Sequence, residues 1–205
     1  VFDADAFAQT MRDGDVGILK IVPRHLRGLL QAQRSADLLP SDALILGGEA
    51  CDVALLEEIR QLRPQCRILN HYGPTECTIT ATIYDVPAQP DPAEVNGVVP
   101  LGHPQGPVEA YVLDENLEPQ PIGVPGELGL GGPTLSPRYL RRDNLTRERF
   151  VTHPFRAGER LYRTGDRARI HADGTLEFLG RSDRQIKVGG YRVEPGEIEA
   201  WFGRL

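Results

Sequence analysis

The first 85 residues constrain the fold more than any other part of this chain. Short apolar runs alternate with helical patterns over this stretch. Strands joined by helices of this length form βαβ units and a parallel sheet. We expect a short helix around Phe7 and Met11, strands at 16–21, 43–46 and 67–70, and helices at 23–33 and 52–62.

The composition changes after Val86. Residues 87–107 are rich in Pro and Gly and are expected to form loops. Short β-type runs follow, and Asp173-Gly174 between two of them is a strong hairpin signal. We expect strands at 108–113, 127–130, 161–163 and 175–179, then a strand pair within 185–193 and a helix at 195–202.

These patterns predict an α/β fold in three parts. A parallel, doubly wound sheet subdomain is expected over residues 1–90. A small β-rich, barrel-like subdomain is expected over 91–181, and the start of an α+β C-terminal subdomain over 182–205. The chain begins without methionine and within a helical pattern, which is typical of a piece cut from a larger chain.

Charge and cysteine content exclude some classes of function. The formal net charge of −6 gives no electrostatic footprint for nucleic acid or an anionic membrane. No apolar run is long enough to span a bilayer, and the N-terminus is not a signal peptide. Three cysteines without metal-ligand spacing favour a reducing, cytoplasmic location.

The segment 70–76, Asn-His-Tyr-Gly-Pro-Thr-Glu, follows the third expected strand. Ligands of open α/β sheets lie beyond the carboxyl ends of the strands. Tyr72 offers a flat face for a base, Thr75 a hydroxyl for a phosphate, and Glu76 a carboxylate for Mg²⁺. An equally simple interpretation is a Gly-Pro turn with Thr75 as a helix N-cap and Glu76 in the first turn.

Two later segments carry further polar groups. In 162–166, Tyr-Arg-Thr-Gly-Asp, a carboxylate at a strand end could accept bonds from both ribose hydroxyls; the alternative is a plain β-turn. In 180–199, the polar residues 181–184 interrupt two strand patterns, where a hinge could absorb a backbone rotation. The alternative there is a surface hairpin followed by a helix.

Together these segments, in this order, resemble adenylate-forming, AMP-binding enzymes, and in particular the adenylation domains of nonribosomal peptide synthetases. Acyl-CoA synthetases and luciferases are wider relatives. The resemblance covers nearly the whole chain. It is carried by 72–76, by 126–140 from Gly-Glu-Leu to Arg-Tyr-Leu, by 162–166 and by 180–199.

The resemblance implies roles for individual residues. It implies two catalytic contacts, Thr75 with the α-phosphate and Glu76 with the magnesium. The nucleotide contacts that it implies are Gly48, Glu49, Ala50, Asn70 and Tyr72 around adenine, and Asp166 with the nearby Arg181 at the ribose. It also implies that Asp183 is the hinge residue and that Gly190 lies in the loop that guides phosphopantetheine.

The implied reaction joins an amino acid to ATP, giving aminoacyl-AMP and pyrophosphate. A peptidyl carrier protein then takes the acyl group on its phosphopantetheine thiol, beside a neighbouring condensation domain. Alternatives are an acyl- or aryl-CoA ligase of the same superfamily, or a non-catalytic module completing a partner chain. The sequence departs from the family's usual motif at two places. Family members often have Arg at the position of Gly189, and Ala-Arg-Gly at the positions of residues 136–138, which are Ser-Pro-Arg here.

Some expected parts are not found in these residues. They contain no Gly-rich Ser/Thr phosphate loop ending in Lys, and no match to the family's C-terminal lysine. Asp3 lies beside Phe2, but its surroundings do not match the family's aspartate that receives the substrate amino group. We therefore expect these 205 residues alone to be a poor catalyst. Robust amino-acid-dependent ATP–pyrophosphate exchange would contradict that expectation.

The resemblance also gives a substrate pocket with an unusual cation. Lys20 is expected to share one strand face with Val16, Ile18 and Val22, and a cation on an apolar face usually has a partner because burying an unpaired charge is costly. Lys20 with His71 would suit a substrate carboxylate, so we expect an acidic amino acid, with aspartate first and asparagine as its closest rival. The alternative is a solvated strand end. The pocket positions are Lys20, Ile45, Gly47, His71, Ile79 and Thr80.

Overall fold

The computed structural model describes residues 3–31, 35–88 and 97–203 as a mixed α/β protein, which confirms the predicted fold class. The predicted domain boundary near residue 90 lies outside the described residues, and the three predicted ranges stay a prediction. The chain divides into two compact units. The first is Val1–His71, Tyr84–Val99 and Lys187–Arg192, and the second is Tyr72–Ile83, Pro100–Ile186 and Val193–Leu205.

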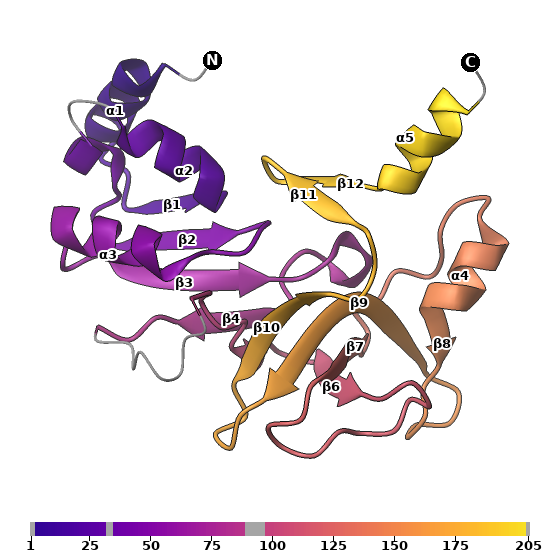
Figure 1. Cartoon of the computed structure of the whole chain (residues 1–205). Coiled ribbons are helices and arrows are strands. Elements are labelled where there is room, and N and C mark those ends of the chain that lie inside the picture. Colours follow the sequence, from indigo (N-terminus) through magenta and orange to yellow (C-terminus); the bar gives the residue numbers. More distant parts are fainter. Residues whose placement is uncertain (1–2, 32–34, 89–96, 204–205) are drawn as a thin grey trace. The chain divides into compact units, whose positions relative to one another are not determined.

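The first unit contains the expected parallel strands and their helices (Figure 1). The strands pair in register, with Lys20 beside Ile45 and Gly47 beside His71. In chain order the elements are α1 (Ala4–Asp13), β1 (Ile18–Ile21), α2 (Pro23–Leu30), the 3₁₀ turn η1 (Ser35–Leu38), β2 (Ala43–Gly47), α3 (Val53–Leu62) and β3 (Arg67–Tyr72).

Local chemistry explains where these helices begin. The carboxylate of Asp3 accepts the N–H groups of Asp5 and Ala6, so this aspartate is the N-cap of α1. Asp52 caps α3 in the same way, through the N–H of Leu55 at 2.9 Å. Apolar faces of the helices then pack on the strands in one core, whose fully buried members include Leu26, Leu44, Leu46, Leu55, Ile59 and Ile68.

The second unit is built on an antiparallel sheet with the order β10-β9-β7-β6, and β8 also pairs with β9. Its core includes Leu128, Leu130, Ala168 and Leu176. Its elements are η2 (Thr75–Cys77), β5 (His103–Pro104), β6 (Glu109–Leu113), β7 (Gly126–Gly131), α4 (Asp143–Arg149), β8 (Phe150–Thr152), β9 (Arg160–Ile170) and β10 (Leu176–Arg181). The strand β4 (Thr82–Asp85) is divided, with its first two residues in the second unit and its last two in the first.

The last described residues form the expected strand pair and helix. Strands β11 (Ile186–Val188) and β12 (Tyr191–Val193) form a two-stranded sheet, followed by α5 (Pro195–Phe202). Gly189 and Gly190 join the strands with φ of 58° and 83°, a conformation that glycine adopts without steric cost. None of the described helices combines the length and apolar character that a membrane span requires.

Candidate functional site

The chain reverses sharply at Gly73, directly after β3. A Cβ atom on this residue would lie 2.6 Å from both the nitrogen of Ala81 and the carbonyl oxygen of Ile79, so only glycine fits. The carbonyl of Pro74 accepts the N–H groups of Cys77 and Ile79. The Gly-Pro pair therefore makes a tight loop with its backbone groups turned inward.

This loop holds two β-branched residues in the left-handed region, with φ of 56° at Thr78 and 69° at Ile79. Such residues rarely adopt this conformation, and strain of this kind gathers at functional sites. The Thr78 hydroxyl donates to the carbonyl of Thr134 at 2.8 Å, and the Cys77 thiol lies 3.1 Å from the Thr134 hydroxyl. These contacts hold the loop in place and leave Ile79 62% exposed.

The loop places its two predicted functional side chains differently. Thr75 begins η2 with an exposed side chain, and the cap residue is Pro74, so Thr75 is not the N-cap. Glu76 is buried, and its carboxylate accepts a hydrogen bond from the hydroxyl of Tyr139. Burial, followed by this bond, raises the pKa of Tyr139. The Thr75 hydroxyl is open to a ligand, whereas the Glu76 carboxylate is fixed within the unit.

Sequence reasoning missed Tyr139. It lies in the 126–140 segment that carries the family resemblance, but its spacing gives no sign that it reaches Glu76, 63 positions earlier. Its hydroxyl also lies 3.4 Å from that of Tyr162, which is almost fully buried. Two phenols therefore order the surroundings of the Glu76 carboxylate.

Glu76 is also the predicted magnesium ligand. No cluster of three or more His, Cys, Asp or Glu side chains able to hold a metal occurs among the described residues. Mg²⁺ bound together with a nucleotide commonly takes one or two carboxylates and completes its shell with phosphates and water. One fixed carboxylate therefore fits this type of magnesium site and does not fit a cage made of protein ligands alone.

Asp166 lies inside β9, so the expectation of a strand end and the alternative of a β-turn are both wrong. Against β7, Arg163 pairs with Gly129 and Arg167 with Glu127, so β9 carries extra residues between these pairs. The intervening Thr164–Asp166 form a bulge in an 11-residue strand. Bulges re-aim side chains, and the sequence pattern alone shows only a Gly-Asp break.

The bulge satisfies its own polar groups. The Thr164 hydroxyl donates to the carbonyl of Leu128 at 2.7 Å and accepts the N–H of Asp166 at 3.0 Å. Glu127 accepts the N–H of Gly165, and Ser182 donates both its N–H and its hydroxyl to the carbonyl of Gly165. Because the surrounding strands fix this backbone, the direction of the Asp166 side chain is fixed as well.

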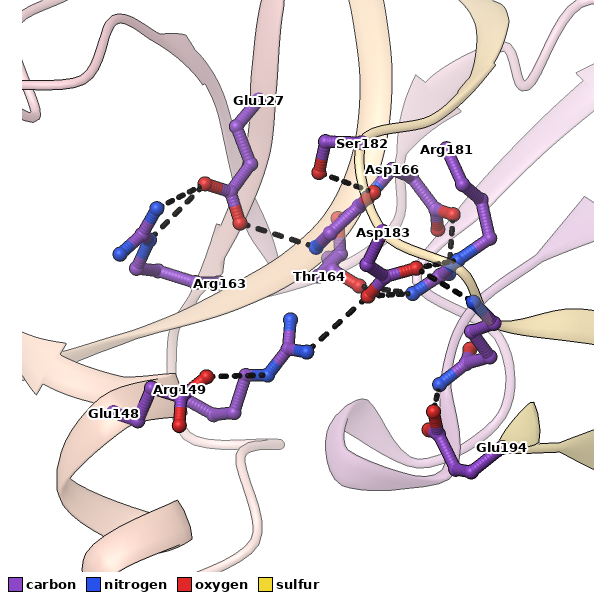
Figure 2. Close-up of polar contacts among 12 residues, drawn as sticks. Glu127, Glu148, Arg149, Arg163, Thr164, Asp166, Arg181, Ser182, Asp183 and Glu194 are labelled. Atoms are coloured by element: carbon purple, nitrogen blue, oxygen red, sulfur yellow. Dashed lines mark hydrogen bonds and ion pairs between the residues drawn. The ribbon is translucent and has the colours of Figure 1, made fainter. Parts of the chain in front are cut away.

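The carboxylate of Asp166 joins two predicted nucleotide residues. The Tyr72 hydroxyl donates to its Oδ2 at 2.5 Å, and Arg181 Nη1 donates to its Oδ1 at 2.6 Å. Burial, followed by the charge of Asp166, raises the pKa of Tyr72. The structure thus brings Tyr72, Asp166 and Arg181 together, although 94 positions separate the first two. Figure 2 shows Asp166 and Arg181 within a wider polar network.

The other predicted adenine residues lie in the first unit. Gly48 has a φ of 93°, which suits the turn after β2. The Glu49 carboxylate accepts the N–H of Arg24 at 2.6 Å and supplies the cap that Val22 cannot give α2. Asn70 is buried, and its Nδ2 lies 3.5 Å from the carbonyl of Val99. Its role toward adenine, like that of the exposed Ala50, stays a prediction.

The substrate residues of the first unit differ from expectation in one respect. Lys20 is exposed, and Ile18 on the same face is 62% exposed, so this face of β1 is not apolar and buried. Among the residues that the structure describes, β1 ends the strand order and pairs with β2 alone, which leaves this face less covered. Burial lowers the pKa of His71, and the positive charge of Lys20 lowers it further. Gly47 has no room for a Cβ beside the His71 backbone.

The sequence of this chain is similar to one family model and to several peptide synthetases. The model of the AMP-binding enzyme family matches residues 1–140. Tyrocidine synthase 3 of Brevibacillus parabrevis is 42% identical over 179 residues, 87% of this chain and 3% of that protein. Chondramide synthase cmdD of Chondromyces crocatus is 48% identical over 161 residues, 78% of this chain and 4% of that protein.

Solved structures give the same result for the fold. Holo-PA1221, described as an NRPS protein containing adenylation and PCP domains, matches with a TM-score of 0.88 and 29% identity over 99% of this chain and 35% of that chain. NpsA-ThdA, an artificially fused adenylation–PCP di-domain from Klebsiella oxytoca, matches with a TM-score of 0.83 and 28% identity over 98% of this chain and 36% of that chain. This chain therefore spans about a third of these structures and under a tenth of the two synthetases.

Proposed function

Because the chain belongs to the AMP-binding enzyme family, we propose that it forms the nucleotide-holding part of an ATP-dependent ligase, an adenylation domain of the nonribosomal peptide synthetase type. The proposed reaction joins an amino-acid carboxylate to the α-phosphate of ATP and releases pyrophosphate. The observation that carries the proposal is the Asp166 carboxylate, fixed between the Tyr72 hydroxyl and Arg181.

The chemistry of Asp166 suits a ribose. An ionised carboxylate accepts hydrogen bonds on both of its oxygens, with about four lone-pair sites in all, and Tyr72 and Arg181 each donate to a different oxygen. Two vicinal hydroxyls are donors that match such an acceptor, and bonds to an ionised acceptor are about twice as strong as neutral ones. Rigid support by the β9 bulge means that little conformational freedom is lost on binding.

The reaction itself needs positioning more than proton transfer. The attacking carboxylate is already an anion near neutral pH, so no general base is required. Thr75 presents an exposed hydroxyl that can donate to a phosphate oxygen, and Glu76 is the proposed ligand for Mg²⁺. Bound there, the metal would neutralise charge on the phosphates. The chain's own contribution is to hold these groups still, which the Gly73 turn and Tyr139 do.

We propose a phosphopantetheine thiol on a peptidyl carrier protein as the acyl acceptor. Support comes from structural relatives described as containing adenylation and PCP domains. In this proposal Gly190 belongs to the loop beside the pantetheine arm, Asp183 is the hinge residue, and a condensation domain neighbours the complete protein. Offering coenzyme A and a holo carrier protein as alternative acceptors separates this proposal from a CoA ligase.

The proposed substrate is an acidic amino acid, with aspartate favoured over asparagine. Lys20 carries the positive charge, and the lowered pKa of His71 keeps its imidazole neutral at pH 7, where it can donate one hydrogen bond. A substrate carboxylate would use both groups. Ile45, Gly47, Ile79 and Thr80 are the further proposed pocket residues.

Amino-acid-dependent ATP–pyrophosphate exchange by the protein that carries this chain tests the proposal. We expect aspartate to give the highest rate and Lys20→Ala to remove that preference. Arg67→Ala is the matched control, because Arg67 is an exposed cation of the same unit that is paired with Asp85. A folded Lys20→Ala variant that still prefers aspartate would contradict the substrate assignment. Exchange with no amino acid would contradict the function.

A further inference from the structure

Three charged side chains meet over Gly165 in the β9 bulge (Figure 2). Gly165 has a φ of 74°, and a Cβ atom there would lie 2.6 Å from Asp183 Oδ2, 2.9 Å from Arg181 Nη2 and 3.0 Å from Arg149 Nη1. The absent side chain therefore makes the space in which these groups pack. They come from β10, from the segment that follows it, and from α4.

The carboxylate of Asp183 is held from two directions. Arg181 binds it with two donors, Nε to Oδ1 at 2.7 Å and Nη2 to Oδ2 at 2.8 Å. Arg149, in the last turn of α4, donates from Nη2 to Oδ2 at 3.2 Å. Burial alone would raise the pKa of Asp183, but the bonds and charge of Arg181, with help from Arg149, lower it.

Arg181 donates hydrogen bonds to two carboxylates. Its Nη1 donates to Asp166, and its Nε and Nη2 donate to Asp183. Nη2 also donates to the carbonyl of Thr164 at 3.2 Å. The side chains of Asp166 and Asp183 are only 10% and 26% exposed, so one guanidinium between them would leave one negative charge poorly screened. Arg149, whose side chain is 19% exposed, supplies the second positive charge and balances the cluster.

We infer that Arg149 is a positioning residue, which holds the carboxylate of Asp183 and thereby fixes the segment from Arg181 to Gln185. With Asp183 shared in this way, Arg181 keeps one donor on Asp166. The inference rests on the proposed function only in taking Asp166 as the ribose acceptor. The ordering of the segment follows from the contacts alone.

Two backbone amides of this segment depend on the cluster, so their hydrogen exchange measures how firmly Asp183 is held. The N–H of Ser182 donates to the carbonyl of Gly165 at 2.9 Å, and the N–H of Gln185 donates to Asp183 Oδ1 at 3.2 Å. If Asp183 is held less firmly, the Gln185 bond is weakened directly, and the Ser182 bond is weakened because its neighbour is less well fixed. Both amides should then exchange with solvent more readily.

Arg147 provides a matched control on the same helix. It is exposed, and its guanidinium bonds to Asn144 one turn earlier, within α4. The other ion pair of Arg149, to Glu148 at 3.7 Å, involves a carboxylate that is 65% exposed. Replacing either arginine removes the same charge from the same helix, but only Arg149→Gln removes a donor to Asp183, which Arg181 still holds.

Amide hydrogen exchange on the nucleotide-free protein tests the inference. We expect Arg149→Gln to speed exchange at Ser182 and Gln185 by about fivefold to tenfold, which corresponds to a charge-assisted bond of moderate exposure. Arg149→Lys should restore part of the protection, and Arg147→Gln should change nothing. Asp183→Asn should give a similar effect, and the double variant Arg149→Gln/Asp183→Asn should add little to it.

The outcomes separate this inference from the proposed function. Unchanged exchange in a folded Arg149→Gln variant, or fully additive effects in the double variant, would overturn the inference. A second measurement determines the affinity for AMP. This affinity should fall several-fold in Arg149→Gln and should equal that of the wild type in Arg147→Gln. If AMP binds neither wild type nor variant while the exchange difference persists, the proposed function fails and the ordering role of Arg149 stands.

Discussion

Two segments of the second unit hold predicted nucleotide groups in different ways. The loop from Gly73 to Ala81 is fixed by shape, through a turn with no room for a Cβ, strained backbone and uncharged contacts to Thr134. The bulge at Thr164–Asp166 has a backbone held by hydrogen bonds of the neighbouring strands, but its Asp166 carboxylate is held largely by charge, through Arg181 and its partners. Steric changes should therefore damage the first segment most, whereas changes in charge and pH should act on the second.

The largest expected effect is that of Gly73→Ala. Its Cβ would meet backbone atoms at 2.6 Å, and backbone cannot rotate away as a side chain can. We expect a loss of about 3 kcal/mol or more in the free energy of unfolding, measured by urea denaturation. Gly28→Ala in α2 is the control, since nothing lies within 4 Å of that position, and it should stabilise the protein by about 0.5–1 kcal/mol.

Gly165→Ala should cost less, about 2 kcal/mol, although its Cβ comes equally close to neighbouring atoms. Those neighbours are the flexible ends of Asp183, Arg181 and Arg149, which can move at the expense of their ion pairs. Most of the remaining cost is the positive φ. If urea denaturation finds Gly165→Ala more harmful than Gly73→Ala, the distinction between shape and charge does not hold.

Tyr139→Phe sharpens the comparison within the shape-held loop. The variant keeps the ring but removes the hydroxyl that donates to the buried Glu76 carboxylate. We expect a loss of about 1.5 kcal/mol in the free energy of unfolding and a higher Mg²⁺ requirement for nucleotide binding. Titration of nucleotide binding against Mg²⁺ measures the second effect. A Mg²⁺ requirement equal to wild type would exclude Tyr139 as a support for the metal ligand.

The smallest expected effect is a pH dependence of the charge-held bulge. The pKa of Asp183 is lowered on folding, so its stabilisation is complete above the unfolded-state value of about 3.9 and is lost as the pH falls through the folded-state value. The stability gap between wild type and Arg149→Gln, about 1 kcal/mol near neutral pH, should therefore shrink below about pH 4. The difference in stability between wild type and Gly73→Ala should not shrink in this pH range. Acid titrations of unfolding check both.

Most elements could be predicted from the sequence because their patterns are local. The apolar faces of α2 and α3 and the runs of β1 to β3 follow from hydrophobic periodicity, and Asp52 marks a helix start. The short strands β5 and β8 were not predicted, because two or three residues carry no periodicity and become strands only when a neighbouring strand pairs with them.

The candidate site was predictable as a set of residues but not as a geometry. The motifs gave Tyr72, Asp166 and Arg181 by resemblance, yet the bonds among them span up to 94 positions and depend on sheet register. Tyr139 and Arg149 were missed for the same reason. Lys20 was expected on an apolar face and is exposed, because a periodic pattern does not show that β1 lies at the edge of the sheet within the described part of the chain.

Equilibrium binding of AMP and its deoxy analogues is the most direct test of the central claim that Asp166 accepts the ribose hydroxyls. We predict that Asp166→Asn weakens AMP binding at least about tenfold. The 2′-deoxy and 3′-deoxy analogues should bind wild type more weakly than AMP, but should lose little further affinity in the variant. A folded Asp166→Asn protein that binds AMP as tightly as wild type, and still discriminates against the deoxy analogues, would contradict the account.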